Sequence, residues 1–130
     1  MNYDLEKKFV ESFIQKRWQE RIMYEFSKEK KRKVALSRFC HNADNYIKKN
    51  TIIYKGYNFD DIIDLIEFKS KEECYIISWD EDDGLSVSIG KALDKINNAG
   101  LSMILIFSVY SIVITEKELG DTMMYLLRVC

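Results

Sequence analysis

The sequence has 130 residues, of which 47% are hydrophobic and 32% are charged, and its formal net charge is −1. This composition is typical of globular proteins and excludes an intrinsically disordered chain. The apolar runs are much shorter than the roughly 20 residues of a membrane-spanning helix, and no apolar signal segment follows Met1. We therefore expect a single domain over residues 1–130, a cytoplasmic location and no membrane partner.

The small net charge hides an uneven distribution along the chain. Residues 1–55 contain 14 Lys and Arg against 7 Asp and Glu, whereas residues 56–130 contain 6 against 14. Two interpretations follow. The halves attract each other in the folded protein, or one of them presents its charge to a partner of opposite charge.

Residues 1–50 are predicted to be mainly helical. Apolar side chains at helical spacing predict one long helix over residues 3–31 and a second helix through residues 36–47. The first pattern contains Val10, Ile14, Trp18, Ile22 and Phe26. Between the two helices lies a basic cluster, residues 28–33, which suits either the C-terminal end of a helix dipole or a bound phosphate.

Residues 51–100 mix short strands and helices. We expect an edge strand at 51–54, a helix at 59–68 capped by Asn58, a strand at 74–79, an acidic turn at 80–84 and a helix at 88–98. A strand, a helix and a strand in succession predict a βαβ-like unit. The strands at 74–79 and 102–107 would then be parallel.

Residues 101–115 form the most apolar and β-branched stretch of the chain, and we expect them to supply two central strands of a sheet. The uninterrupted apolar run 103–107 predicts a strand that is covered on both faces. Residues 112–115 and 122–129 are expected to form a hairpin around 118–121. The fold class is therefore α+β, with long N-terminal helices packed on a four- to five-stranded mixed, mostly antiparallel sheet.

Few residue patterns point to catalysis. His41 is the only histidine, and Arg38 shares its side of the predicted helix, so a nuclease site with His41 as base is one interpretation. We favour the other interpretation, in which His41 is a polar residue beside the core face of its helix. The three cysteines, Cys40, Cys74 and Cys130, lack metal-ligand spacing, and no phosphate-binding loop is present. We expect no catalytic residue, metal ion or cofactor.

The acidic turn is the candidate binding site. Its spacing does not fit a calcium-binding EF-hand loop, because Leu85 and Lys91 occupy the places that require Gly and Glu. Consecutive carboxylates can instead imitate a phosphate backbone, with an adjacent tryptophan as an anchor. A solvated acidic turn without a partner is the alternative. The candidate partner-binding residues are Trp79, Asp80, Glu81, Asp82 and Asp83, with Asp60, Asp61 and Asp64 as further acidic contacts.

Scattered blocks of the chain carry a resemblance. Residues 13–21, 31–33 and 38–41, and later 74–78, 83–84, 91–93 and 125–128, are similar to small uncharacterised bacterial proteins that resemble immunity proteins of secreted-toxin systems. The resemblance implies a binding protein rather than an enzyme, with a cognate toxin as its partner. We expect that toxin to be a nuclease whose active site the acidic surface covers.

Two other functions remain open. An RNA-associated protein or nuclease would use residues 28–33, Arg38 and His41, although we regard nucleic acid as the less favoured partner. A homo-oligomer would use the second apolar stripe of the first helix, which contains Leu5, Phe9, Phe13 and Met23.

Overall fold

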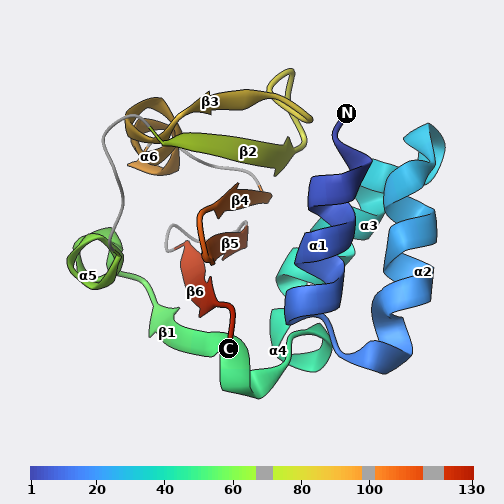
Figure 1. The fold of residues 1–130 in the computed structure, drawn as a ribbon, viewed down its shortest axis with the longest axis horizontal. Helices are drawn as coiled ribbons and strands as arrows, with labels where there is room; N and C mark the ends of the chain where they lie inside the picture. Colours follow the sequence, from blue (N-terminus) through green and yellow to red (C-terminus); the bar gives the residue numbers. More distant parts are fainter. Residues whose placement is uncertain (67–71, 98–101, 116–121) are drawn as a thin grey trace.

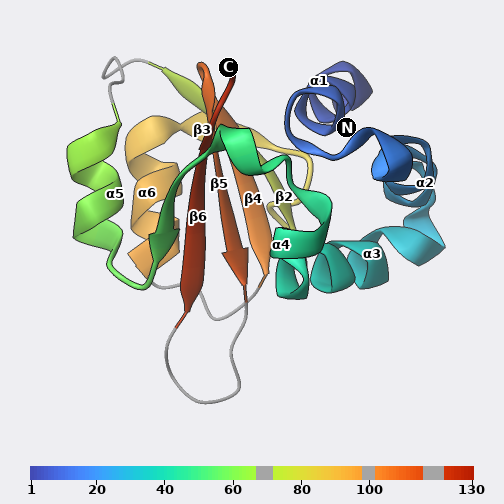
Figure 2. The ribbon, with the colours of Figure 1, turned by 90° about the horizontal axis from the view of Figure 1, so that it is seen from below.

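The computed structural model describes residues 1–66, 72–97, 102–115 and 122–130 of the chain. It is an α+β fold in which helices cover both faces of a six-stranded antiparallel sheet (Figures 1 and 2). The helices are α1 (Tyr3–Phe13), α2 (Lys16–Ser27), α3 (Glu29–His41), α4 (Ala43–Tyr46), α5 (Phe59–Leu65) and α6 (Ile89–Asn97), with a 3₁₀ turn at Lys49–Thr51. The strands are β1 (Ile52–Gly56), β2 (Glu73–Ser78), β3 (Ser86–Ser88), β4 (Met103–Phe107), β5 (Tyr110–Thr115) and β6 (Met123–Arg128).

The sheet has the order β1-β6-β5-β4-β2-β3. The prediction of two central strands within residues 101–115 is confirmed, because β4 and β5 lie in the middle and are buried along almost their whole length. The prediction of an edge strand near residue 52 is also confirmed. The predicted α+β class and mostly antiparallel sheet are confirmed, but among the described residues the sheet has six strands instead of four to five, and each pairing is antiparallel instead of mixed.

The predicted parallel pairing of residues 74–79 with 102–107 is wrong for a specific reason. After β2 the chain turns back at once and forms the short strand β3, which pairs antiparallel with β2. The crossover helix α6 therefore follows β3 and not β2. As a result β4 returns antiparallel to β2 on the side opposite β3.

The first face of the sheet is covered by α1 to α4. Phe9, Val10, Phe39 and their neighbours on these helices pack against strand residues such as Ile104 and Val113. Burial of this apolar surface is the main stabilising term for the layer, at roughly 25 cal/mol per Å². In Figure 1 these helices occupy the right-hand side, with α2 outermost.

The predicted single helix over residues 3–31 is wrong, because the chain breaks twice within it. At the first break Ile14 forms an isolated antiparallel bridge with Ile47. The backbone N–H of Gln15 donates to the carbonyl of Tyr46 at 2.8 Å, and that of Lys48 donates to Phe13 at 2.7 Å. These long-range bonds replace helical ones. The second break, at Lys28, turns the chain from α2 into α3.

The second face is covered by α5 and α6. Ile62, Ile89 and Ala92 pack there against alternate residues of the central strands, including Leu105 and Ile112. The predicted cap is confirmed, since the Asn58 side chain accepts a hydrogen bond from the N–H of Asp60 at 2.9 Å. α5 ends at Leu65, so the predicted helix is longer than the observed one within the described residues.

Two predicted features lie outside the described residues, namely the end of the helix at residue 98 and the turn at 118–121. Within the described ranges no helix combines the length and the apolar character that crossing a membrane requires.

Candidate functional site

The acidic turn, residues 80–84, joins β2 to β3 and is held by its own hydrogen bonds. The Ser78 hydroxyl donates to Asp80 Oδ1 at 2.7 Å, and the N–H of Asp82 donates to the same oxygen at 3.0 Å. The N–H of Ser78 donates to Asp83 Oδ1 at 3.0 Å. Gly84 closes the turn with φ +82°, a conformation that suits glycine. The turn therefore has a defined shape.

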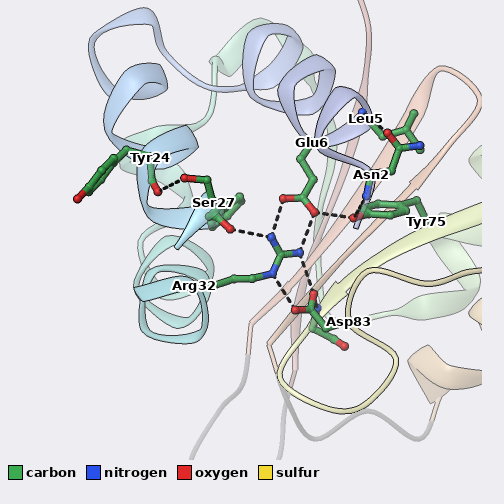
Figure 3. Close-up of polar contacts among 10 residues, drawn as sticks. Asn2, Leu5, Glu6, Tyr24, Ser27, Arg32, Tyr75 and Asp83 are labelled. Carbon is green, nitrogen blue, oxygen red and sulfur yellow. Dashed lines mark hydrogen bonds and ion pairs between the residues drawn. The ribbon is translucent and has the colours of Figure 1, made fainter. Parts of the chain in front are cut away.

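A buried charge network ties this turn to the helical layer (Figure 3). The Arg32 guanidinium of α3 lies between two carboxylates and binds each through two nitrogens. Its contacts to Glu6 of α1 measure 2.6 and 2.8 Å, and those to Asp83 measure 2.7 and 2.9 Å. Glu6 is 0% and Arg32 is 4% exposed. The Tyr75 hydroxyl of β2 also donates to Glu6, at 2.6 Å.

All five N–H donors of Arg32 are used, because the fifth donates to the carbonyl of Phe26 at 2.9 Å. Burial alone would lower the pKa of Arg32, but the hydrogen bonds and charges of Glu6 and Asp83 outweigh it and raise that pKa. Burial, together with Glu6, raises the pKa of Tyr75 to about 12. A guanidinium with every donor occupied has none left for a substrate phosphate. We interpret the network as structural.

Lys95 of α6 reaches the same turn from the other face of the sheet. Its Nζ lies 2.5 Å from Asp80 Oδ2 and 2.6 Å from Asp82 Oδ2. The side chains of these two aspartates remain 33% and 34% exposed, whereas that of Asp83 is 10% exposed. The turn and the residues bridged to it carry a net charge of −3. The two cations are Arg32 and Lys95, and the five carboxylates are those of Glu6, Asp80, Glu81, Asp82 and Asp83.

A cleft of about 560 Å³ lies beside the turn, on the side of the N-terminal helices. Asp80 and Asp83 line it from the turn, Arg32 and Glu29 line it from α3, and Tyr3 lies at the start of α1. The acidic turn is therefore one wall of a depression.

The predicted site residues do not form one surface. Glu81 is exposed on the turn, whereas Trp79 is only partly exposed and packs against the core below the helical layer. The indole N–H of Trp79 is buried and has no hydrogen-bond partner among the described residues. Asp60, Asp61 and Asp64 are exposed on α5, at the other end of the sheet from the turn (Figures 1 and 2).

The structure does not bring Arg38 and His41 together as a site. The Arg38 guanidinium forms an ion pair with Glu25 of α2. His41 is exposed near the end of α3, and its Nδ1 lies 2.7 Å from the carbonyl oxygen of Ser37. Because a carbonyl oxygen can only accept a hydrogen bond, Nδ1 is the donor in this contact. Burial raises the pKa of the Cys40 thiol and raises that of Cys74 to about 12. Both thiols are therefore protonated at neutral pH and poor nucleophiles.

Sequence reasoning missed the residues that organise the turn, namely Glu6, Arg32 and Lys95. A signal for the first two was present. Glu6 lies four residues before Val10 and Arg32 four residues before Leu36, so each occupies a place in an apolar row of its helix. Among residues 1–66, 72–97, 102–115 and 122–130, no group of three or more His, Cys, Asp or Glu side chains is arranged to hold a metal ion.

Comparison of the chain with protein-family models, with curated proteins and with solved structures gives no match.

Proposed function

We propose that this chain is a binding protein of the immunity type. It neutralises a cognate bacterial toxin, a nuclease, by covering the toxin's active site with the acidic turn. The chain itself performs no chemistry in this role. A nuclease active site is basic because it binds phosphates, and a compact group of carboxylates is the complementary surface.

The observation that carries the proposal is the acidic turn, which is held by hydrogen bonds and ion pairs and still has a net negative charge. Arg32 and Lys95 fix the positions of Asp80, Asp82 and Asp83 without cancelling the local charge. A pre-ordered loop loses less conformational entropy on binding than a mobile one, so more of its interaction energy appears as affinity. The remaining negative charge speeds the encounter with a basic partner.

Glu81 is the residue on which this function depends most directly. It is exposed at the turn, and no ion pair to it is present among the described residues. Its charge is therefore fully available to a partner. Asp80 and Asp82 add partly exposed carboxylate oxygens, while Asp83 faces Arg32 and has a supporting role.

The test is the association rate with a toxin-like domain encoded beside this protein, should its genome contain one. Glu81→Lys should slow association about tenfold at low salt, because it reverses the charge that steers the encounter, and the effect should shrink as salt rises. Glu20→Lys is the matched control. It makes the same charge change at an exposed position of α2 and should leave the association rate nearly unchanged.

Equal rates for Glu81→Lys and the unmodified chain would remove the acidic turn from the interface. If Asp60→Lys with Asp64→Lys slowed association instead, the contact would be α5, at the other end of the sheet.

A further inference from the structure

A second charged surface lies on the outer edge of the helical layer. It consists of Tyr24 near the end of α2 and of Lys28, Lys30, Lys31 and Lys33 at the start of α3, and we refer to it as the basic face. One of these residues, Lys33, also lines the cleft beside the acidic turn, together with Asp80 and Asp83. All five residues are exposed. In Figure 1 α2 forms the right-hand edge of the molecule, and α3 lies beside it, nearer the sheet.

The charge of the basic face is not neutralised by its surroundings. Among the described residues none of its four lysines takes part in an ion pair. Arg32, in the middle of the same segment, points inward to Glu6 and Asp83. Residues 28–33 thus bury one cation, Arg32, with its counter-ions and expose four lysines. Glu29 is the only acidic residue among them, so the exposed side chains carry a net charge of +3.

An aromatic ring lies within this charge. Tyr24 is 51% exposed. The Nζ atoms of Lys28 and Lys31 lie over its ring, 5.4 and 5.1 Å from the ring centre. An exposed ring and two ammonium groups are the elements that proteins use for single-stranded nucleic acid, in which a base stacks on the ring in place of an ammonium group and the neighbouring phosphates meet the displaced cations.

We propose that the basic face is a binding surface for single-stranded RNA. The phosphates contact Lys28, Lys31 and Lys33, and an unpaired base stacks on Tyr24. The ring distinguishes this partner from an anionic lipid surface, which would use the lysines but not a stacking platform. No residue of the acidic turn takes part, so loss of toxin binding in Glu81→Lys and loss of RNA binding in the lysine variant described below are separate outcomes.

The experiment is a fluorescence anisotropy titration of the full chain into a labelled oligouridine of about twelve nucleotides, at about 50 mM and about 200 mM salt. The unmodified chain should bind, and its affinity should fall with salt. Lys28→Ala/Lys31→Ala/Lys33→Ala should weaken binding at least tenfold at low salt. It should also reduce the slope of log affinity against log salt by about 2, because each phosphate contact on a single strand contributes about 0.7.

Two further variants separate charge from stacking. Tyr24→Leu should lower affinity about tenfold and leave the salt slope unchanged, since stacking releases no counter-ions. Lys7→Ala/Lys8→Ala/Lys91→Ala removes the same number of exposed charges elsewhere and should change binding less than threefold. Circular dichroism confirms that each variant is folded.

Absence of RNA binding at low salt would overturn the proposal. So would equal weakening by the two triple-lysine variants, which would indicate nonspecific attraction. Binding to phosphatidylserine vesicles without binding to RNA would also overturn it and assign the basic face to a membrane surface.

Discussion

Arg32 is the residue that connects the helical layer to the acidic turn. It is buried with Glu6 and Asp83, so its removal would leave two carboxylates without a counter-ion in a poorly hydrated place. Breaking a buried ion pair from one side typically costs about 3–5 kcal/mol, even where the intact pair adds little net stability. We therefore expect Arg32→Leu to lower the free energy of unfolding by about that amount.

Urea denaturation measures this effect. Lys33→Leu, one residue along the same helix and exposed, is the control and should change stability by less than about 0.5 kcal/mol. A similarly small change for Arg32→Leu would mean that the network does not hold the turn to the helices.

At the scale of the element, Gly84 determines how the acidic turn closes. Its φ of +82° is unfavourable for any residue with a side chain, and a Cβ there would lie 2.9 Å from Cγ of Met1. The left-handed backbone alone costs roughly 1–2 kcal/mol for a non-glycine residue. Gly84→Ala should therefore reduce the free energy of unfolding by about that amount.

Gly90 in α6 offers the matched control, because a Cβ there meets nothing within 4 Å. Gly90→Ala should be neutral or stabilise by up to about 1 kcal/mol, since alanine favours the helix. Thermal denaturation of both variants measures whether Gly84→Ala destabilises the protein while Gly90→Ala does not. Equal effects at both glycines would contradict the strained closure of the turn.

The bridge between α6 and the turn predicts a pH dependence. Burial opposes the shift, but the hydrogen bonds from Lys95 and Ser78 outweigh it and lower the pKa of Asp80 below 3.8. A carboxylate with a lowered pKa stabilises the folded state above its ordinary pKa, and this contribution is lost as the pH falls through the lowered value.

Lys95→Met should therefore destabilise the protein by about 1 kcal/mol at neutral pH, a modest value because the bridge is partly exposed to solvent. The difference from the unmodified chain should shrink as the pH falls below 3.8 and through the lowered pKa of Asp80, because Asp80 is protonated in both proteins only below that lowered value. Urea denaturation across this range is the measurement. A difference that stays constant with pH would mean that Lys95 stabilises through packing and not through charge.

Several elements were predictable because their signals are local. The apolar run 103–107 predicts a doubly covered strand, and Asn58 followed by acidic residues predicts a capped helix. The break between α1 and α2 was not predictable in this way. The apolar row Val10, Ile14, Trp18 continues through it, and the bridge from Ile14 to Ile47 depends on a segment more than 30 residues away.

At the scale of the whole molecule, the charge division seen in the sequence has a structural counterpart. Part of it is internal, because basic Arg32 of the N-terminal half binds acidic Asp83 of the C-terminal half. The rest stays on the surface, as the basic face on α2 and α3 and as exposed aspartates on α5, which covers the other face of the sheet (Figure 1). The Arg32–Asp83 pair fits the interpretation that the two halves attract each other, whereas a partner of opposite charge stays a prediction.

The candidate site was predictable only in part. The acidic turn stands out in the sequence as consecutive carboxylates. The sequence does not indicate that this turn pairs with Arg32 and Lys95. Arg32 lies 51 positions before Asp83, and Lys95 lies 13 positions after Asp82. Nor does the sequence indicate that Asp60, Asp61 and Asp64 lie far from the turn. That separation follows from the strand order, which sequence patterns did not predict.

Isothermal titration calorimetry with a toxin-like domain encoded beside this protein, should its genome contain one, is the strongest test of the proposed immunity function. We expect one-to-one binding with a roughly nanomolar dissociation constant, typical of a standard-sized protein interface, together with loss of the toxin's nuclease activity at the same stoichiometry. No heat of binding to a folded and active toxin domain would contradict the claim.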